Sequence, residues 1–110
     1  MPTQVDIGDT FSRQLRRLAR RYPSVADTVD HLIAQLETDN RPGAKLTGLG
    51  YQVYKVRLPN RSARRGKSGG FRAIYQERSG RLVLLLLIYS KTERADIPDE
   101  TIIRVIEEAN

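Results

Sequence analysis

Three cationic side chains on two neighbouring stretches of strand-like sequence have the types and spacing to bind a phosphate group. Lys55 and Arg57 are two residues apart in the alternating stretch Tyr51–Leu58, so they share one face of a strand. Arg72 lies near the start of the next strand-like stretch and could join them. Like charges on adjacent strands repel one another, and an anionic ligand would relieve that repulsion. The pattern therefore predicts a phosphate site on the face of a sheet.

The segment between these two strands, Pro59–Gly70, adds further cations and contains no acid. Glycines at its end allow a ligand to approach the backbone closely. Its Gly-Lys-Ser letters also end a nucleotide-binding P-loop, but that motif requires glycine where Arg61 stands, and a helix where Phe71–Tyr75 has strand character. We therefore expect a phosphate-contacting loop and no nucleotide site, with a merely solvated loop as the alternative. The candidate contacts are Arg61, Arg64, Arg65 and Lys67.

Composition narrows the classes of protein to which the chain can belong. Its 110 residues suit one small domain over the whole chain, and the lack of cysteine excludes a disulfide framework, a thiol nucleophile and a cysteine-ligated metal. The chain has no apolar run of about 20 residues and no signal-peptide core, so we expect a cytoplasmic location and no membrane partner. The net charge of +6 favours a polyanion or an acidic protein as partner, although solubility alone would also explain it.

Apolar spacing predicts the elements that must position the cations. A short strand at Val5–Ile7 precedes two amphipathic helices, followed by three sequential strands and a C-terminal helix. Strands joined by short turns favour an antiparallel sheet, so we expect an α+β fold in which the helices, a hairpin and a C-terminal helix, pack on one face of a small antiparallel sheet of three to four strands. The expected helices are Phe11–Tyr22, Val25–Leu36 and Ile97–Ala109, and the later strands are Tyr51–Leu58, Phe71–Gln76 and Leu82–Tyr89.

The polar faces of the first helix carry five arginines and no acid. Such a surface can bind nucleic-acid phosphates through charge alone, whereas a solvated helix face would look the same in the sequence. The five are Arg13, Arg16, Arg17, Arg20 and Arg21, of which Arg13, Arg17 and Arg20 are our candidate RNA contacts.

Four stretches, in order, resemble the RelE family of bacterial toxins from type II toxin–antitoxin pairs, within the RelE/ParE superfamily. They are FSRQLRRLARRYP in the first helix, YKVRL, GGFRAIY and LLLLIYSKTERADI, and together they cover nearly the whole chain. The resemblance implies a helical hairpin packed on a small antiparallel sheet whose cationic face is open to RNA. It also implies an endoribonuclease that cleaves mRNA on the ribosome, inhibits translation and is neutralised by a cognate antitoxin, with no cofactor.

The resemblance assigns roles residue by residue. Lys55 and Arg57 match the two basic positions of the family's YK-x-[KR]-L strand, and Arg72 matches the arginine of its G-[YF]-R strand. Lys91 matches a lysine just after the last long strand.

Two positions depart from the family's best-studied branch. The arginine that follows the lysine there, and a tyrosine near the C-terminus, are replaced here by Thr92 and Pro98. Tyr89 is our candidate for the missing aromatic, which completes the catalytic set. The long basic loop resembles a subgroup with a KSGG-x-R motif.

Cleaving RNA through its own 2′-hydroxyl requires a base, stabilisation of extra charge on the phosphate, and an acid for the departing 5′-oxygen. The single histidine, His31, falls in the second helix beside apolar residues, and we expect it to be structural or exposed. We therefore expect Lys55 or Lys91 to transfer protons, because neighbouring cations disfavour the charged form of a lysine. Arg57 and Arg72 would hold the scissile phosphate. Alternatively, all four bind phosphate and the ribosome supplies the geometry.

The acids near the C-terminus do not form an expected metal site. Their spacing is not convergent, and we attribute the first three to a helix start and the last two to solubility. They are Asp96, Asp99, Glu100, Glu107 and Glu108.

Two other functions stay open from the sequence. A ParE-like protein would inhibit DNA gyrase by protein contact, and a chain with Thr92 and Pro98 could be an inactive module that binds RNA or antitoxin.

Overall fold

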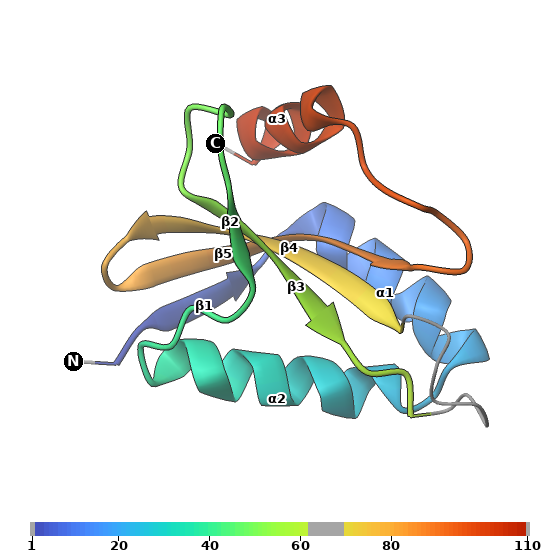
Figure 1. The fold of residues 1–110 in the computed structure, drawn as a ribbon. Helices are drawn as coiled ribbons and strands as arrows, with labels where there is room; N and C mark the ends of the chain where they lie inside the picture. The colour runs from blue at the N-terminus through green and yellow to red at the C-terminus, as the bar shows by residue number, and fades with distance from the viewer. Residues whose placement is uncertain (1, 62–69, 110) are drawn as a thin grey trace.

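The computed structural model describes residues 2–61 and 70–109, and its helices and strands follow the expected order (Figure 1). Each expected element is present within a few residues of its predicted bounds. The sequence did not predict β2, a three-residue strand between two glycine-containing turns. The elements are β1 (Gln4–Ile7), α1 (Asp9–Arg21), α2 (Val25–Glu37), β2 (Ala44–Leu46), β3 (Val53–Leu58), β4 (Phe71–Ser79), β5 (Leu82–Ser90) and α3 (Asp99–Glu108).

The sheet has five strands in the order β1-β5-β4-β3-β2. Strands β2 to β5 pair in antiparallel fashion, whereas β1 runs parallel to β5, with Val5 opposite Val83. The prediction of an antiparallel sheet of three to four strands was therefore wrong in strand number and in the direction of this edge strand. Parallel neighbours need a long connection between them, and the pairing of β1 with β5 spans most of the chain, where local spacing gives no signal.

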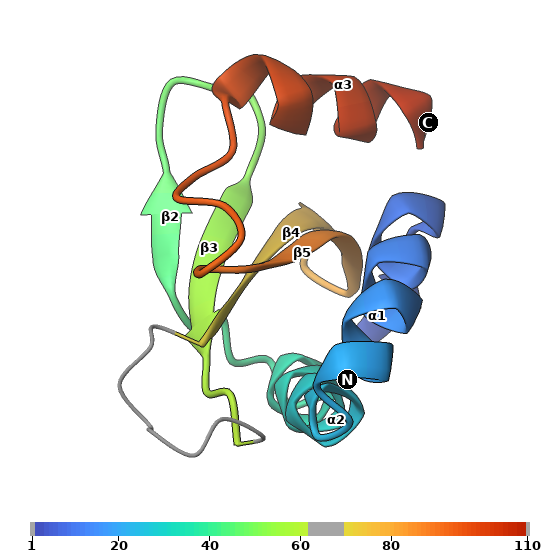
Figure 2. The ribbon, with the colours of Figure 1, turned by 90° about the vertical axis from the view of Figure 1, so that its right-hand side faces the viewer.

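Helices cover both faces of the sheet, not one face as the sequence suggested. Helices α1 and α2 pack against one face around Phe11, Leu32 and Tyr75, and we call this the closed face. Helix α3 packs against the opposite face, with Ile102 and Ile106 in a second core (Figure 2). The physical reason lies in β5, which is apolar on both sides and must be covered on both.

An irregularity in β5 determines which of its side chains point to each face. The register with β4 shifts between Ile74 and Tyr75. Leu86 and Leu87, although consecutive, both join the core under α3, and Ile88 returns to the closed face. The alternation of side chains therefore restarts after Leu86, as expected at a β-bulge.

Helix α1 buries the apolar stripe that the sequence predicted. Phe11, Leu15 and Leu18 form an apolar stripe on α1, and Phe11 and Leu18 are fully buried. The polar faces of α1 keep their arginines in solvent. None of the helices in the described ranges is long and apolar enough to cross a bilayer.

Candidate functional site

Four predicted cations converge on one hollow at the end of the sheet away from the α3 core. Lys55 and Arg57 come from β3, Arg72 from β4, and Lys91 follows β5 directly. They line a hollow of about 520 Å³, whose rim includes Gly43 at the start of β2. The structure thus brings together four of the five residues that the sequence predicted to be catalytic.

Register explains why the arginines meet. Arg57 and Arg72 are directly opposite each other on β3 and β4, and Arg72 is opposite Tyr89 on β5. Arg57 is exposed, whereas Arg72 is only 7% exposed and donates a hydrogen bond to the Phe71 carbonyl at 3.2 Å. Like charges directly opposite one another destabilise a sheet, and an anion bound beside this pair would relieve their repulsion.

Tyr89, the fifth predicted catalytic residue, is buried opposite Arg72 and is not among the residues that line the hollow. Its side chain is 2% exposed and belongs to the core under α3. Burial raises the pKa of the Tyr89 phenol, and the neighbouring Asp96 carboxylate raises it further, whereas Arg72 opposes the rise. The phenol therefore keeps its proton at neutral pH and does not serve as a phenolate base, but it can still donate and accept hydrogen bonds.

An acid that the sequence did not assign to the site pairs with one of its cations. The Asp96 Oδ1 atom lies 3.2 Å from Lys55 Nζ and accepts the Ile97 backbone N–H at 2.9 Å. The Ile97 amide lowers the pKa of Asp96, and Lys55 and Lys91 lower it further. Attributing Asp96 to a helix start was therefore wrong, because α3 begins at Asp99.

Asp96 belongs to the segment 91–98, which we call the β5–α3 connection. Within it, the Lys91 ammonium donates to the Ala95 carbonyl at 2.7 Å. The connection thus holds two of the four cations of the hollow. An aspartate five residues after a lysine that directly follows a strand was the only signal for this in the sequence.

The two departures from the family pattern have structural roles here. The Thr92 hydroxyl lies 2.8 Å from that of Ser90, which holds the start of the β5–α3 connection. Pro98 is the residue before the first turn of α3, where its fixed φ suits a helix start.

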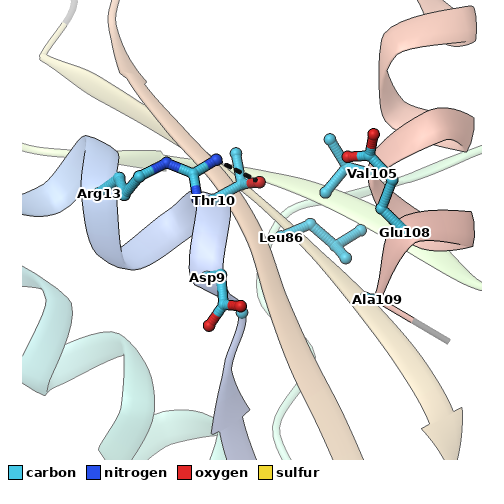
Figure 3. Close-up of a pocket in the computed structure, with 8 residues that line it drawn as sticks. Asp9, Thr10, Arg13, Leu86, Val105, Glu108 and Ala109 are labelled. Carbon is cyan, nitrogen blue, oxygen red and sulfur yellow. Dashed lines mark hydrogen bonds between the residues drawn. The ribbon is translucent and has the colours of Figure 1, made fainter.

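The arginines of α1 lie on a different surface. Arg17 and Arg21 form ion pairs with Glu93 at 3.2 and 3.8 Å, and both remain largely exposed. Arg13 donates to the Thr10 hydroxyl at 3.3 Å in a smaller hollow between α1 and α3, opposite Glu108 (Figure 3). Arg16 and Arg20 are exposed. The α1 arginines are therefore placed for surface contacts, not for the chemistry of the main hollow.

The loop cations are only partly described. Arg61 is exposed and lines a second hollow of about 360 Å³ together with Arg57 and His31. His31 is exposed, as expected, but it lies nearer the cationic strands than the sequence suggested. Gly70 leads into β4 and not into a helix, which agrees with the strand character that argued against a P-loop. The predicted contacts Arg64, Arg65 and Lys67 lie outside the described residues.

Metal-binding side chains do not cluster in the described part of the chain. Across residues 2–61 and 70–109, no three side chains of histidine, cysteine, aspartate or glutamate converge in a way that could hold an ion.

Comparison with known proteins identifies the fold. No protein-family model and no curated protein matches the chain. Among solved structures, it is similar to a double arginine-to-alanine mutant of the E. coli toxin RelE in the free state, with a TM-score of 0.57 and 20% sequence identity. The likeness covers 99% of this chain and 95% of that one. The chain has a RelE-like fold.

This finding confirms the expected α+β class, with a helical hairpin, a small sheet and a C-terminal helix. The four-cation hollow therefore lies on the sheet of a RelE-like domain, on the side of the sheet that α3 covers only in part.

Proposed function

We propose that the chain is the toxin of a type II toxin–antitoxin pair and acts as an endoribonuclease on ribosome-bound mRNA. The proposal rests on the hollow lined by Lys55, Arg57, Arg72 and Lys91. It is supported by the RelE-like fold that carries this hollow. Four cations around one space, with an arginine pair opposed across two strands, suit a phosphodiester better than any neutral ligand.

Arg57 and Arg72 would hold the scissile phosphate. Each guanidinium is a planar fork that matches the geometry of phosphate oxygens. Arg72 is held by burial and by the Phe71 carbonyl, so little reorganisation is needed when negative charge grows on the phosphate. We expect this preorganised charge to contribute most of the rate enhancement of RNA cleavage.

Lys55 and Lys91 would transfer the protons of the reaction. Attack by the 2′-hydroxyl requires loss of a proton, and departure of the 5′-oxygen requires the gain of one. Both ammonium groups line the same hollow as the arginines. Tyr89, which lies opposite Arg72 on β5 and near Asp96, would support these groups from the buried core.

The remaining cations would bind the ribosome. The α1 arginines and the loop cations Arg61, Arg64, Arg65 and Lys67 carry positive charge outside the hollow, where they can contact ribosomal RNA phosphates. A cognate antitoxin with acidic and apolar segments would cover the cationic face and block RNA entry.

Primer extension on a defined mRNA tests this function. The purified chain is incubated with and without ribosomes, beside Arg72→Ala. We expect cleavage within the A-site codon only when ribosomes are present, and about a 100- to 1000-fold lower rate in the variant, as for loss of one preorganised donor to a developing charge. Arg78→Ala is the matched control, because Arg78 is an exposed arginine at the far end of the same strand. It should cleave at the wild-type rate.

Other outcomes point to other functions. An unaltered rate for Arg72→Ala would contradict the proposed site. Absence of cleavage in every condition, with RNA still bound, would favour an inactive RNA-binding module, the reading suggested by Thr92 and Pro98. Growth arrest accompanied by gyrase-linked DNA damage would instead identify a ParE-like inhibitor.

A further inference from the structure

An acidic side chain occupies a place where the proposed substrate would repel it. The Asp96 carboxylate lies 3.2 Å from the Lys55 ammonium, which lines the cationic hollow. A phosphodiester bound by Lys55 would approach the same ammonium and meet the carboxylate as a like charge. Carboxylate and phosphate oxygens are equivalent acceptors for a lysine, so the two anions compete for one cation.

The β5–α3 connection engages a second cation of the hollow beside the first. Lys91 Nζ donates to the Ala95 carbonyl at 2.7 Å, one residue before Asp96. Two consecutive residues of the connection therefore supply acceptors to two of the four cations. Because these residues are adjacent in the chain, displacement of one acceptor also disturbs the other.

The ion pair between Lys55 and Asp96 has the properties of one that an external anion can displace. The side chains of Lys55 and Asp96 are 31% and 67% exposed, so solvent reaches both partners, and such ion pairs contribute only about 0–1 kcal/mol. Asp96 also has its pKa lowered by the Ile97 amide and by Lys55, so it remains a full negative charge and a weak base at neutral pH. A competitor for phosphate fits these properties better than a proton acceptor does.

We propose that Asp96 is an internal substitute for an RNA phosphate, which pairs with Lys55 in the absence of RNA and is displaced when a phosphodiester enters the hollow. The inference rests on the proposed function and goes beyond it by assigning Asp96 a role in setting RNA affinity. Asp96 is thus a positioning residue that acts through Lys55 and does not touch the reacting atoms.

Fluorescence anisotropy with a labelled, fully 2′-O-methylated single-stranded RNA of about 12 nucleotides tests the exchange, because this probe binds without being cleaved. Asp96→Asn keeps the oxygen that accepts the Ile97 amide and removes the charge. We expect it to bind the probe about two- to fivefold more tightly than the wild type, the effect of removing an exposed ion pair.

The matched control is Asp99→Asn, which makes the same chemical change three residues away. Within the described ranges, no ion pair or side-chain hydrogen bond joins Asp99 to another residue. We expect its affinity to equal that of the wild type. Equal gains in both variants would mean that net charge alone sets affinity, and would overturn the inference.

A double-mutant cycle with Lys55→Met shows whether Asp96 acts through Lys55. The gain from Asp96→Asn should vanish in the Lys55→Met background. An unaltered or weaker affinity for Asp96→Asn would overturn the inference, and weaker binding would show that the carboxylate orients Lys55 toward phosphate.

Failure of the proposed function would look different. In that case Lys55→Met and Arg72→Ala would bind the probe as tightly as the wild type, so that the RNA does not use the hollow at all.

Discussion

The two faces of β4 differ sharply at its first residues, although these residues alternate along one strand. Phe71, Ala73 and Tyr75 point into the closed face and are fully buried against α1 and α2. Arg72 points to the other side, into a hollow with three further cations. Tyr75, the polar member of the closed face, donates its hydroxyl to the Pro42 carbonyl at 2.6 Å.

The comparison shows that different parts of the sheet serve stability and ligand binding. The closed face is stabilised by apolar burial, with its polar atoms paired inside the protein. The opposite face is apolar under α3, where Ile74 is buried, and gathers like charges only at the hollow, where an anionic ligand would relieve their repulsion. Substitutions on the closed face should therefore change the free energy of unfolding, and substitutions of the cations of the hollow should chiefly change RNA binding and cleavage.

The largest expected effect is loss of a core side chain from the closed face. Phe71 is fully buried and packs edge-on against Tyr22, with 5.4 Å between ring centroids. We expect Phe71→Ala to lower the free energy of unfolding by about 3–5 kcal/mol, measured by urea denaturation. Arg78→Ala, on the exposed part of the strand, should change it by less than about 0.5 kcal/mol. A loss of under about 1 kcal/mol for Phe71→Ala would refute the division between faces.

A smaller effect is expected where the backbone forms the rim of the hollow. Gly43 has φ of +95°, and a Cβ there would lie 2.3 Å from the Lys55 carbonyl oxygen. Gly48 has φ of +83° with open space around it. Both alanine variants carry the strain of positive φ, about 1–3 kcal/mol, but only Gly43→Ala must also displace the strand that bears Lys55.

Thermal unfolding and RNA cleavage of the two glycine variants test this difference. We expect Gly43→Ala to be the less stable and to lose cleavage activity, and Gly48→Ala to keep it. Equal stability and equal cleavage by the two variants would show that the close approach of Gly43 to β3 does not matter for activity.

The smallest effect is a loss of stability at alkaline pH. Burial raises the pKa of both Tyr75 and Tyr89 in the folded chain. Above about pH 10, tyrosines of the unfolded chain lose protons that the folded chain retains, so the unfolded state binds fewer protons and stability falls as pH rises. The slope is at most about 1.4 kcal/mol per pH unit for each tyrosine.

Urea denaturation between about pH 9 and 11 measures this slope. Tyr75→Phe should be less stable at neutral pH, because the Pro42 carbonyl loses its donor, and its stability should fall less steeply with pH. An unchanged slope would mean that Tyr75 ionises as readily in the folded protein as in the unfolded chain.

The sequence predicted the local features of the fold well, because helical and strand periods are local properties. The stripe of Phe11, Leu15 and Leu18 and the apolar run of β5 placed their elements within a few residues. The short strand β2 and the parallel pairing of β1 were missed, because three residues carry little period and pairing is a long-range property. The side of the sheet that α3 covers was missed for the same reason.

The sequence could predict the part of the candidate site that depends on the alternation of side chains along a strand. Lys55, Arg57 and Arg72 share a face because odd and even positions of a strand separate. Asp96 was misread, because a charge near a helix start is usually explained by the dipole and its partner Lys55 lies 41 positions earlier. Only the folded connection shows that the two meet.

The β-bulge in β5 gives the position of Lys91 an unusual dependence on chain length. Leu84 and Leu86 face α3, so strict alternation would send residue 88 to that side and Tyr89 and Lys91 to the other. Because Leu87 also faces α3, the alternation of side chains starts again at Leu87, and Tyr89 comes to lie beside Arg72. Leu86 is the extra residue of the bulge, so deleting one leucine of this run would let β5 alternate strictly and would leave Lys91 on the same side of the sheet. An inserted residue that the bulge does not absorb would instead turn Lys91 to the other side, so insertions in β5 should be tolerated less well than deletion of one of these leucines.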